Sequence, residues 1–298
     1  MTQKLGDISI IGPGTVGTAL GVLAARAGLK VTAIGGRDPR RTQQAARMIR
    51  PAATAASMTD AARSGDLILL CVSDDAIEPV FKQLVEEGAF RGGCVIAHCS
   101  GALGSELLSP ARRLGCHVGS LHPLATFPNV PRAVEALAGC YCFIEGDALA
   151  VTWLSELARR IGAIPLALQG QAKPLYHAAA VMACNYQAAL IDAALELMKQ
   201  AGIEPEHALR ALAPLARSTM DNILSLGPQQ ALTGPIARGD LSTVAAHLRA
   251  MRRLPRLRAL YCQAGQWTIQ LARRKGTLSA RRAGELERLL RGQSTAAD

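Results

Sequence analysis

The stretch Ile8-Ser-Ile-Ile-Gly-Pro-Gly-Thr-Val-Gly17 decides the fold, because it places a complete G-x-G-x-x-G pattern directly after a short apolar run. In a strand–turn–helix unit, the first glycine permits the tight turn and the second lets the backbone approach a pyrophosphate. The third lets the helix pack on the strand, and the free N–H groups at the helix start favour an anion. The sequence therefore predicts a dinucleotide held by Gly12, Pro13, Gly14, Thr15, Val16 and Gly17. A plain strand–turn–helix without a ligand is the alternative.

Short apolar runs alternate with helical patterns through the first half of the chain. The expected strands are Ile8–Ile11, Lys30–Ile34, Leu67–Val72, Cys94–His98, His117–Ser120, Cys140–Ile144 and Ile164–Leu168. The helices expected between the early strands are Val16–Ala27, Arg40–Ile49, Ala76–Val85 and Ser105–Leu114. This alternation is typical of a parallel sheet with helices on both faces. We expect an α/β Rossmann-type domain with a mostly parallel sheet over residues 1–168.

The periodicity is helical almost throughout from Pro174 onward. Pro174 suits the first turn of a helix and Gly202 suits its end, so one long helix is expected between them. Further helices are expected at Glu206–Ser225, Ser242–Arg252, Leu257–Lys275 and Ala280–Arg291. The chain therefore divides into the Rossmann-type domain and an all-α domain over residues 169–298.

The end of the second expected strand indicates which dinucleotide is bound. An enzyme that uses NAD usually carries an acidic residue there, about twenty residues after the last glycine, but this chain has Arg37, followed by Arg40 and Arg41. A guanidinium binds a 2′-phosphate through two parallel hydrogen bonds. We therefore expect NADP(H). Asp38 could argue for NAD, but we favour a role for it in capping the helix that begins at Pro39.

Small polar residues follow the next strand, in Cys71-Val-Ser-Asp-Asp-Ala76. Ligands of such folds bind at the carboxyl ends of the strands, so Val72 and Ser73 are candidates to line the nicotinamide ribose. The alternative is that Ser73 and Asp74 only cap the helix that begins at Ala76.

Composition and charge exclude several classes of protein. The formal charge is +10, but the arginines are spread along the chain and aromatic residues make up only 3%, so we expect no nucleic-acid partner. No uninterrupted apolar run of eighteen residues occurs, and the start of the chain leads directly into a strand, so we expect a cytoplasmic protein without a membrane partner. The eight cysteines form no C-x-x-C pair, which predicts reduced thiols and no metal site. A positive field favours a small anionic ligand.

Four segments together resemble a known superfamily: ISIIGPGTVG (8–17), LILLCVSDDAIEPV (67–80), HCSGALGSELL (98–108) and SLHPLATF (120–127). They are similar to the Rossmann domains of the 6-phosphogluconate dehydrogenase-like superfamily. That group includes β-hydroxyacid dehydrogenases, ketopantoate reductases, pyrroline-5-carboxylate reductases and prephenate dehydrogenases. The resemblance is strongest to a branch of predicted NADP oxidoreductases whose helical C-terminal domain has no assigned function.

The resemblance implies hydride transfer, a substrate between the two domains and a homodimer formed through the helical domain. In β-hydroxyacid dehydrogenases and ketopantoate reductases a lysine on the first long helix donates the proton, and an asparagine one turn later orients the substrate. Here Lys173 and His177 stand at that spacing, so histidine replaces asparagine. Lys173 also precedes Pro174, which disfavours a helical conformation at the lysine. We expect Lys173, His177 and Asn185 to be catalytic, and either of the first two to be the proton donor.

Other residues of the resembling segments are candidates for substrate binding. Ser100 and the N–H of Gly101 could bind a substrate carboxylate, and His122 stands in a segment similar to one of prephenate dehydrogenases. Arg238, in the interrupted run Thr233-Gly-Pro-Ile-Ala-Arg238-Gly-Asp240, is a candidate carboxylate clamp, whereas Asp240 is expected to cap the next helix.

The function expected from these features is NADPH-dependent reduction of a small anionic 2-keto acid similar to ketopantoate. The alternatives are reduction of a cyclic imine similar to pyrroline-5-carboxylate, reduction of a deazaflavin coenzyme, and a dinucleotide sensor without catalysis. Lys173 favours the keto acid, because an imine substrate brings its own proton.

Overall fold

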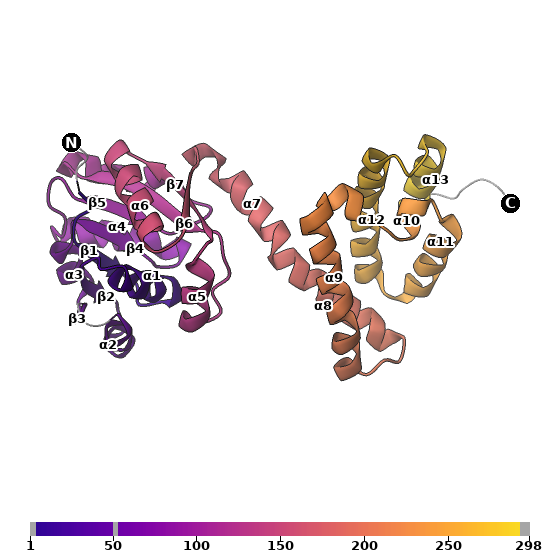
Figure 1. Cartoon of the computed structure of the whole chain (residues 1–298), viewed down its shortest axis with the longest axis horizontal. Coiled ribbons are helices and arrows are strands. Elements are labelled where there is room, and N and C mark those ends of the chain that lie inside the picture. Colours follow the sequence, from indigo (N-terminus) through magenta and orange to yellow (C-terminus); the bar gives the residue numbers. More distant parts are fainter. Residues whose placement is uncertain (1–3, 50–52, 293–298) are drawn as a thin grey trace. The chain divides into compact units, whose positions relative to one another are not determined.

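The computed structural model describes residues 4–49 and 53–292 and separates into two compact units, Met1–Asn185 and Tyr186–Asp298. Each unit is described by itself (Figure 1). The division comes later than the expected boundary at residue 168. The first helix after the sheet therefore belongs to the first unit rather than to the helical one, because its side chains pack on the ends of the strands.

The first unit is built on an eight-stranded sheet with the order β3-β2-β1-β4-β5-β6-β7-β8. The strands are β1 (Ile8–Ile11), β2 (Val31–Gly35), β3 (Thr54–Ala56), β4 (Leu67–Leu70), β5 (Val95–His98), β6 (His117–Pro123), β7 (Tyr141–Gly146) and β8 (Ile164–Ala167). Neighbouring strands are parallel except β6 and β7, which confirms the mostly parallel sheet. The strand order reverses between β1 and β4, which is where Rossmann folds bind their ligands.

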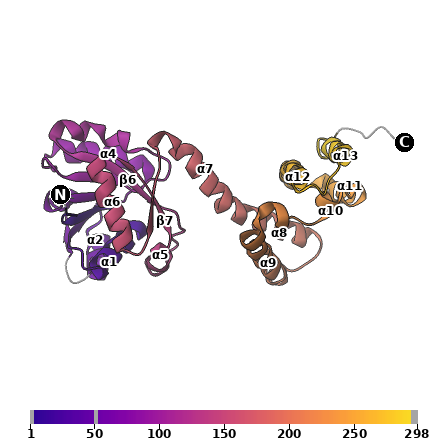
Figure 2. The same ribbon diagram turned by 45° about the horizontal axis from the view of Figure 1, so that its top comes forward.

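Helices cover both faces of this sheet (Figure 2). The helices of this unit are α1 (Thr15–Arg26), α2 (Pro39–Met48), α3 (Met58–Ser64), α4 (Asp74–Glu86), η1 (Ser105–Leu114), α5 (Val130–Leu137), α6 (Ala148–Arg160), η2 (Gly170–Ala172) and α7 (Lys173–Ala183). One core joins α1, α2, α5 and α6 to the sheet, and a second joins α3, α4 and η1 to the opposite face. The expected helix at Ser105–Leu114 is a 3₁₀ helix, which ends at Gly115 in the left-handed conformation with φ 74°.

β6 extends further than the neighbouring strand β5, and this places His122 of β6 beyond the end of β5. His98, the last residue of β5, pairs with Ser120, whereas β6 continues to Pro123 because β7 pairs with it on the other side. His122 therefore lies past the carboxyl end of β5, beside the loop that follows that strand.

The second unit is entirely helical. After α8 (Asn185–Gln200) it contains α9 (Pro205–Ala231), α10 (Pro235–Arg238), α11 (Leu241–Ala250), η3 (Met251–Arg253), α12 (Pro255–Lys275) and α13 (Ala280–Leu290). Its core lies among α10, α11, α12 and α13 and includes Ile236, Val244, Ile269 and Leu286. The helices expected in the second half of the chain are present, but α9 is interrupted at Gly227, where φ is 77°.

The long helix expected from Pro174 to Gly202 is divided at Cys184, whose φ and ψ of −117° and −70° separate α7 from α8. Among the described residues, only the stretch Gly170–Gln200 is long and apolar enough to cross a membrane by length and composition, with a mean hydropathy of 1.3. Its beginning is nevertheless part of the first unit, because Lys173 is buried there.

Candidate functional site

The structure of the turn after β1 explains why each of these positions of the motif is a glycine. Gly12 has φ 113°, and a Cβ there would lie 2.3 Å from the main-chain oxygen of Cys71 at the end of β4. A Cβ at Gly17 would lie 2.3 Å from the main-chain oxygen of Gly12, so this glycine lets α1 pack against the turn. A Cβ at Gly14 would come no closer than 4.0 Å to any protein atom it meets, so the space before Gly14 is open. The turn can therefore accept a phosphate group close to the backbone.

A cavity of about 650 Å³ opens beside this turn. The predicted cofactor residues that line it are Gly12, Pro13, Gly14, Arg37, Arg41, Val72 and Ser73. Sequence reasoning missed further lining residues from α3 and α4, among them Met58, Pro79 and Gln83. The predicted Thr15, Val16, Gly17 and Arg40 are not among the residues described as lining the cavity.

The acidic residue after β2 caps a helix, as expected. Oδ1 of Asp38 accepts hydrogen bonds from the main-chain N–H groups of Arg40 at 2.9 Å and of Arg41 at 3.3 Å. The carboxylate is thus engaged at the start of α2, while the side chains of Arg37 and Arg41 are exposed at the cavity. Basic groups, rather than this carboxylate, are therefore available to a ligand at the end of β2.

The alternative that Ser73 and Asp74 only cap the helix after β4 is partly correct. Ser73 occupies the N-cap position of α4, but its hydroxyl makes no capping hydrogen bond. Asp74 accepts a hydrogen bond of 2.8 Å from the hydroxyl of Ser100 in the next loop. Asp74 therefore joins the ends of β4 and β5.

The loop after β5 is held by its own side chains. The hydroxyl of Ser100 accepts hydrogen bonds from the N–H groups of Ala102 at 3.2 Å and Leu103 at 3.0 Å. The N–H of Ser100 donates to Nδ1 of His98 at 3.2 Å, so Nε2 of that ring carries the hydrogen and donates to the oxygen of Gly104 at 3.1 Å. Burial lowers the pKa of His98 to about 4, which keeps this ring neutral.

Lys173 anchors α7 to the sheet. Its side chain is only 1% exposed, and its ammonium group donates to the oxygen of Ser100 at 2.7 Å and contacts the hydroxyl of Ser120. The residue is helical, with φ −55° and ψ −44°, so the expectation that Pro174 would keep it out of the helix is wrong. These contacts hold the lysine in place despite the unfavourable position before proline. Burial lowers the pKa of Lys173 to about 8, an effect opposed by Glu145, Cys99 and Asp74.

Two histidines converge on Gly101. The rings of His122 and His177 lie 5.9 Å apart at an angle of 77°. A Cβ at Gly101 would lie 2.6 Å from Cδ2 of His177 and 2.7 Å from Nε2 of His122. Gly101 therefore makes room for both imidazoles. Its predicted role in binding a substrate through its N–H stays a prediction, and the structure gives it this packing role.

Tyr176 is the residue of this site that sequence reasoning missed. Its hydroxyl is 2.8 Å from Nδ1 of His122, and its ring lies 4.1 Å from that of Phe143, centroid to centroid. Burial raises the pKa of Tyr176 to about 12 and lowers that of His122 to about 4, the latter helped by the charges of Lys173 and His177. The pair is therefore uncharged near neutral pH, and the tyrosine fixes the orientation of the imidazole.

A second cavity, of about 710 Å³, lies beside this pair of histidines. It is bounded by the loop after β6, by Phe143 and by one side of α7. The described lining residues are His122, Leu124, Ala125, Thr126, Phe127, Phe143, Tyr176, His177, Ala179, Ala180, Val181, Ala183, Cys184 and Asn185. The predicted residues His122, His177 and Asn185 thus share one cavity, whereas Lys173, Ser100 and Gly101 are not among its described lining residues.

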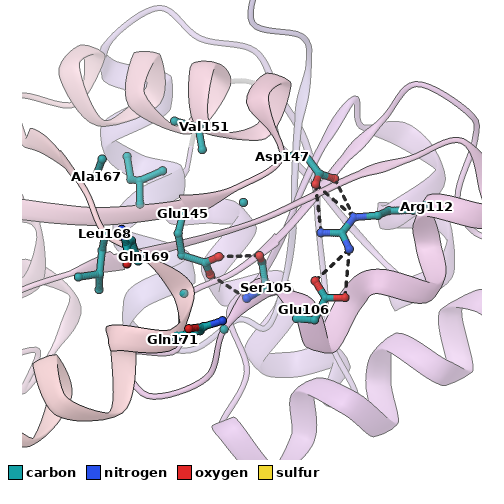
Figure 3. A pocket seen from close by; sticks show the side chains of 14 residues that line it. Ser105, Glu106, Arg112, Glu145, Asp147, Val151, Ala167, Leu168, Gln169 and Gln171 are labelled. Carbon is teal, nitrogen blue, oxygen red and sulfur yellow. Dashed lines mark hydrogen bonds and ion pairs between the residues drawn. The ribbon is translucent and has the colours of Figure 1, made fainter.

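A third cavity, of about 810 Å³, lies between η1, β7 and the segment around η2 (Figure 3). Glu145 accepts hydrogen bonds of 2.7 Å from both the N–H and the hydroxyl of Ser105. Arg112 pairs with Glu106 and Asp147, and Asp147 also accepts a hydrogen bond from the N–H of Val118. These side chains connect η1 to β6 and β7, and we assign them a structural role.

The remaining predictions concern Asp240 and Arg238 of the second unit, the cysteines and a metal site. Asp240 caps α11 as expected, because its carboxylate accepts a hydrogen bond of 3.0 Å from the N–H of Thr243. Arg238 ends α10 and is exposed. The eight cysteines are free, and Sγ of Cys71 lies 3.5 Å from Sγ of Cys99. No group of three or more metal-binding side chains is found among the described residues.

Comparisons with known proteins agree with this architecture. Residues 2–123 match a Rossmann-like domain, and residues 140–268 match DUF2520, a domain of unknown function. No curated protein matches the chain. The expected order of a Rossmann-type domain followed by a C-terminal domain of unassigned function is therefore confirmed.

Solved structures share this fold over most of the chain. Protein TM1727 from Thermotoga maritima is 25% identical, with a TM-score of 0.71, over 90% of this chain and 99% of that one. A provisionally assigned NADP oxidoreductase from Bacteroides fragilis is 22% identical, with a TM-score of 0.71, over 89% and 98%. A reductive aminase from Aspergillus terreus, in complex with NADPH and ethyl-5-oxohexanoate, is 18% identical, with a TM-score of 0.61, over 97% and 93%.

Proposed function

We propose that this chain, which joins a Rossmann-like domain to a DUF2520 domain, is an NADPH-dependent oxidoreductase that reduces a small carbonyl or imine compound. The observation that carries the proposal is the cavity beside the glycine turn. It combines an open backbone at Gly14 with the guanidinium groups of Arg37 and Arg41. The turn suits a pyrophosphate, and the arginines suit the additional phosphate that distinguishes NADPH from NADH.

The bound nicotinamide would supply the hydride, so the protein has to bind the acceptor and provide a proton. We propose His177 as the proton donor and Asn185 as a group that orients the acceptor, because both line the cavity of about 710 Å³. His122 faces the same cavity as a neutral imidazole held by Tyr176. It can therefore form a hydrogen bond to the acceptor without carrying a charge.

Lys173 is the other candidate for the donor. Its pKa of about 8 would suit proton transfer near neutral pH, but its ammonium group is enclosed by Ser100 and Ser120. We therefore propose that Lys173 is a positioning residue, which holds the loop of Ser100 and Gly101 against the two histidines. The resemblance-based role of this lysine as donor remains the alternative.

The substrate classes expected from the sequence make different demands on the protein. A 2-keto acid and 1-pyrroline-5-carboxylate both carry a carboxylate that calls for a cationic partner, whereas an uncharged ketone or imine does not. The hydroxyl of Ser100, proposed to bind the carboxylate, is already engaged with Asp74, Ala102 and Leu103. The reductive aminase that shares this fold binds NADPH together with an uncharged oxo ester, which supports reduction of a carbonyl or imine carbon.

The test is consumption of NADPH by the purified protein with a panel of 2-keto acids, uncharged ketones and cyclic imines. We expect oxidation of NADPH with at least one acceptor, and a strong loss of kcat in His177→Gln with little change in NADPH affinity. A matched control is His207→Gln, on α9 of the helical unit. Binding of NADPH without oxidation by any acceptor would favour the sensor, and absence of NADPH binding would refute the proposal.

A further inference from the structure

We propose that the cavity beside His122 and His177 binds an uncharged, largely apolar carbonyl or imine compound rather than one that carries a carboxylate. This inference rests on the proposed reductase function and specifies its substrate class. It differs from the small anionic substrate expected from the net charge of the chain.

The first observation is the chemistry of the cavity wall. Leu124, Phe127 and Phe143 contribute large apolar side chains, and α7 contributes small ones, among them Ala180 and Val181. Among the described lining residues, none is Lys, Arg, Asp or Glu. A wall of this kind resembles the apolar, aromatic-lined pockets that bind small organic molecules, and the volume lies in their usual range.

The second observation concerns the polar groups at one end of the cavity. Nδ1 of His122 is engaged with the hydroxyl of Tyr176, and the ring of Tyr176 is packed against Phe143. His122 is neutral near pH 7, because burial and the nearby charge of Lys173 lower its pKa. The site thus offers His122 and His177 as hydrogen-bonding groups, but no guanidinium or ammonium group for a carboxylate.

The cation closest in the sequence to these residues is not available to a ligand. Lys173 is not among the described lining residues, its side chain is buried, and its ammonium group donates to the oxygen of Ser100. A carboxylate placed against this wall would lose part of its water without gaining a guanidinium or ammonium partner, which is costly. A carbonyl or imine group needs only one or two hydrogen bonds, which the histidines can supply. The geometry therefore selects an uncharged acceptor.

The experiment uses the full chain and two matched pairs of acceptors. The pairs are ethyl 2-oxobutanoate with 2-oxobutanoate, and 1-pyrroline with 1-pyrroline-5-carboxylate. We expect kcat/KM for NADPH oxidation to be about tenfold or more higher for the uncharged member of each pair, because the carboxylate would lie against a mostly apolar wall without a guanidinium or ammonium partner. Equal or higher values for the carboxylates would overturn the inference and leave the reductase function intact. That result would indicate a cation from outside the described lining.

A charge placed in the wall gives a second test. Ala180→Lys introduces an ammonium group into the lining, and it should shift the preference toward the carboxylates. Ala178→Lys is the matched control, because Ala178 lies on the same helix, is exposed and is outside the described lining. An equal shift in both variants would contradict the assignment of this cavity.

Binding without turnover separates the two proposals. Saturation-transfer NMR on the complex with NADP⁺ measures which member of each pair binds. Preferential binding of the uncharged members without any NADPH oxidation would support the cavity assignment and refute the reductase function. Preferential binding of the carboxylates, or binding of none of the four compounds, would overturn the inference.

Discussion

The ammonium group of Lys173 donates a hydrogen bond to the main-chain oxygen of Ser100 across 2.7 Å and also contacts the hydroxyl of Ser120. These contacts join the start of α7 to the loop after β5 and to the middle of β6, both more than fifty residues earlier in the chain. Burial of the lysine lowers its pKa, and this gives the contact a measurable dependence on pH.

The first prediction concerns that dependence. The folded pKa of Lys173 is about 8 and its ordinary value is 10.5, so between these values the unfolded chain binds a proton that the folded chain has released. The contribution of Lys173 to the free energy of unfolding should therefore rise with pH across this window, by up to about 3 kcal/mol. Urea unfolding of wild type and Lys173→Met measures it as the difference between the two pH profiles.

The control for this prediction is Lys199→Met, which removes an exposed lysine from α8. Its pH profile should parallel that of the wild type. If the profile of Lys173→Met also runs parallel to the wild type, the lysine is not buried as described.

Gly101→Ala should disturb both histidines. A Cβ at this position would lie 2.6 Å from His177 and 2.7 Å from His122, so the imidazoles or the loop must move. We expect a loss of about 1–3 kcal/mol in the free energy of unfolding, typical of overpacking, together with a loss of kcat. Gly104→Ala is the control, because the nearest atom it would meet is 3.7 Å away. Similar losses in both variants would argue against the convergence on Gly101.

Arg37→Ala should reduce the preference for NADPH over NADH. A charged hydrogen-bonding contact of this kind contributes about 1.5–3 kcal/mol, so affinity for NADPH should fall by about ten- to a hundredfold while that for NADH changes little. Titration calorimetry with both cofactors measures the effect. Arg47→Ala, in the last turn of helix α2 that follows Arg37, should leave both affinities unchanged. Equal affinity of the wild type for the two cofactors would show that the arginines do not select the phosphate.

The homodimer remains a prediction, and the surface of the helical unit supports it. Leu215 and Leu224 of α9 are 64% and 78% exposed, and α8 has no buried residue among those described. Apolar surface of this kind is typical of an interface. Sedimentation should show a dimer at micromolar concentration and a monomer for Leu215→Glu/Leu224→Glu. Leu114→Glu, an exposed position of the first unit, should stay dimeric. A monomeric wild type would contradict the prediction.

The sequence predicted those parts of the fold that depend on local patterns. The bounds of β1 match the prediction, and the roles of Gly12 and Gly17 follow from steric contacts that the motif encodes. β3 was missed because three residues at the edge of the sheet give almost no periodic signal. The antiparallel direction of β7 was not predicted, because the apolar pattern of a strand is independent of its direction.

The candidate site was only partly predictable for a related reason. The sequence indicated His122, His177 and Asn185 as candidate site residues, and the structure places them around one cavity. Tyr176 stood between two of the residues singled out, but its partner His122 is 54 positions away, and no local pattern indicates such a contact. The burial of Lys173 depends on Ser100 and Ser120, which only the folded sheet brings to it.

The capping of Ser105 by Glu145 has a consequence for the order in which the chain can fold. The N–H and the hydroxyl of Ser105 both donate to the carboxylate of Glu145, which is synthesised forty positions later. Lys173, the partner of Ser120, follows that serine by 53 positions. A nascent chain that ended at Pro123, near the limit of the Rossmann-like match, would lack both partners. Because a polar group that loses its partner lowers stability, we expect this segment to be less stable alone than within the first unit. The first unit should reach its full stability only when α7 has left the ribosome.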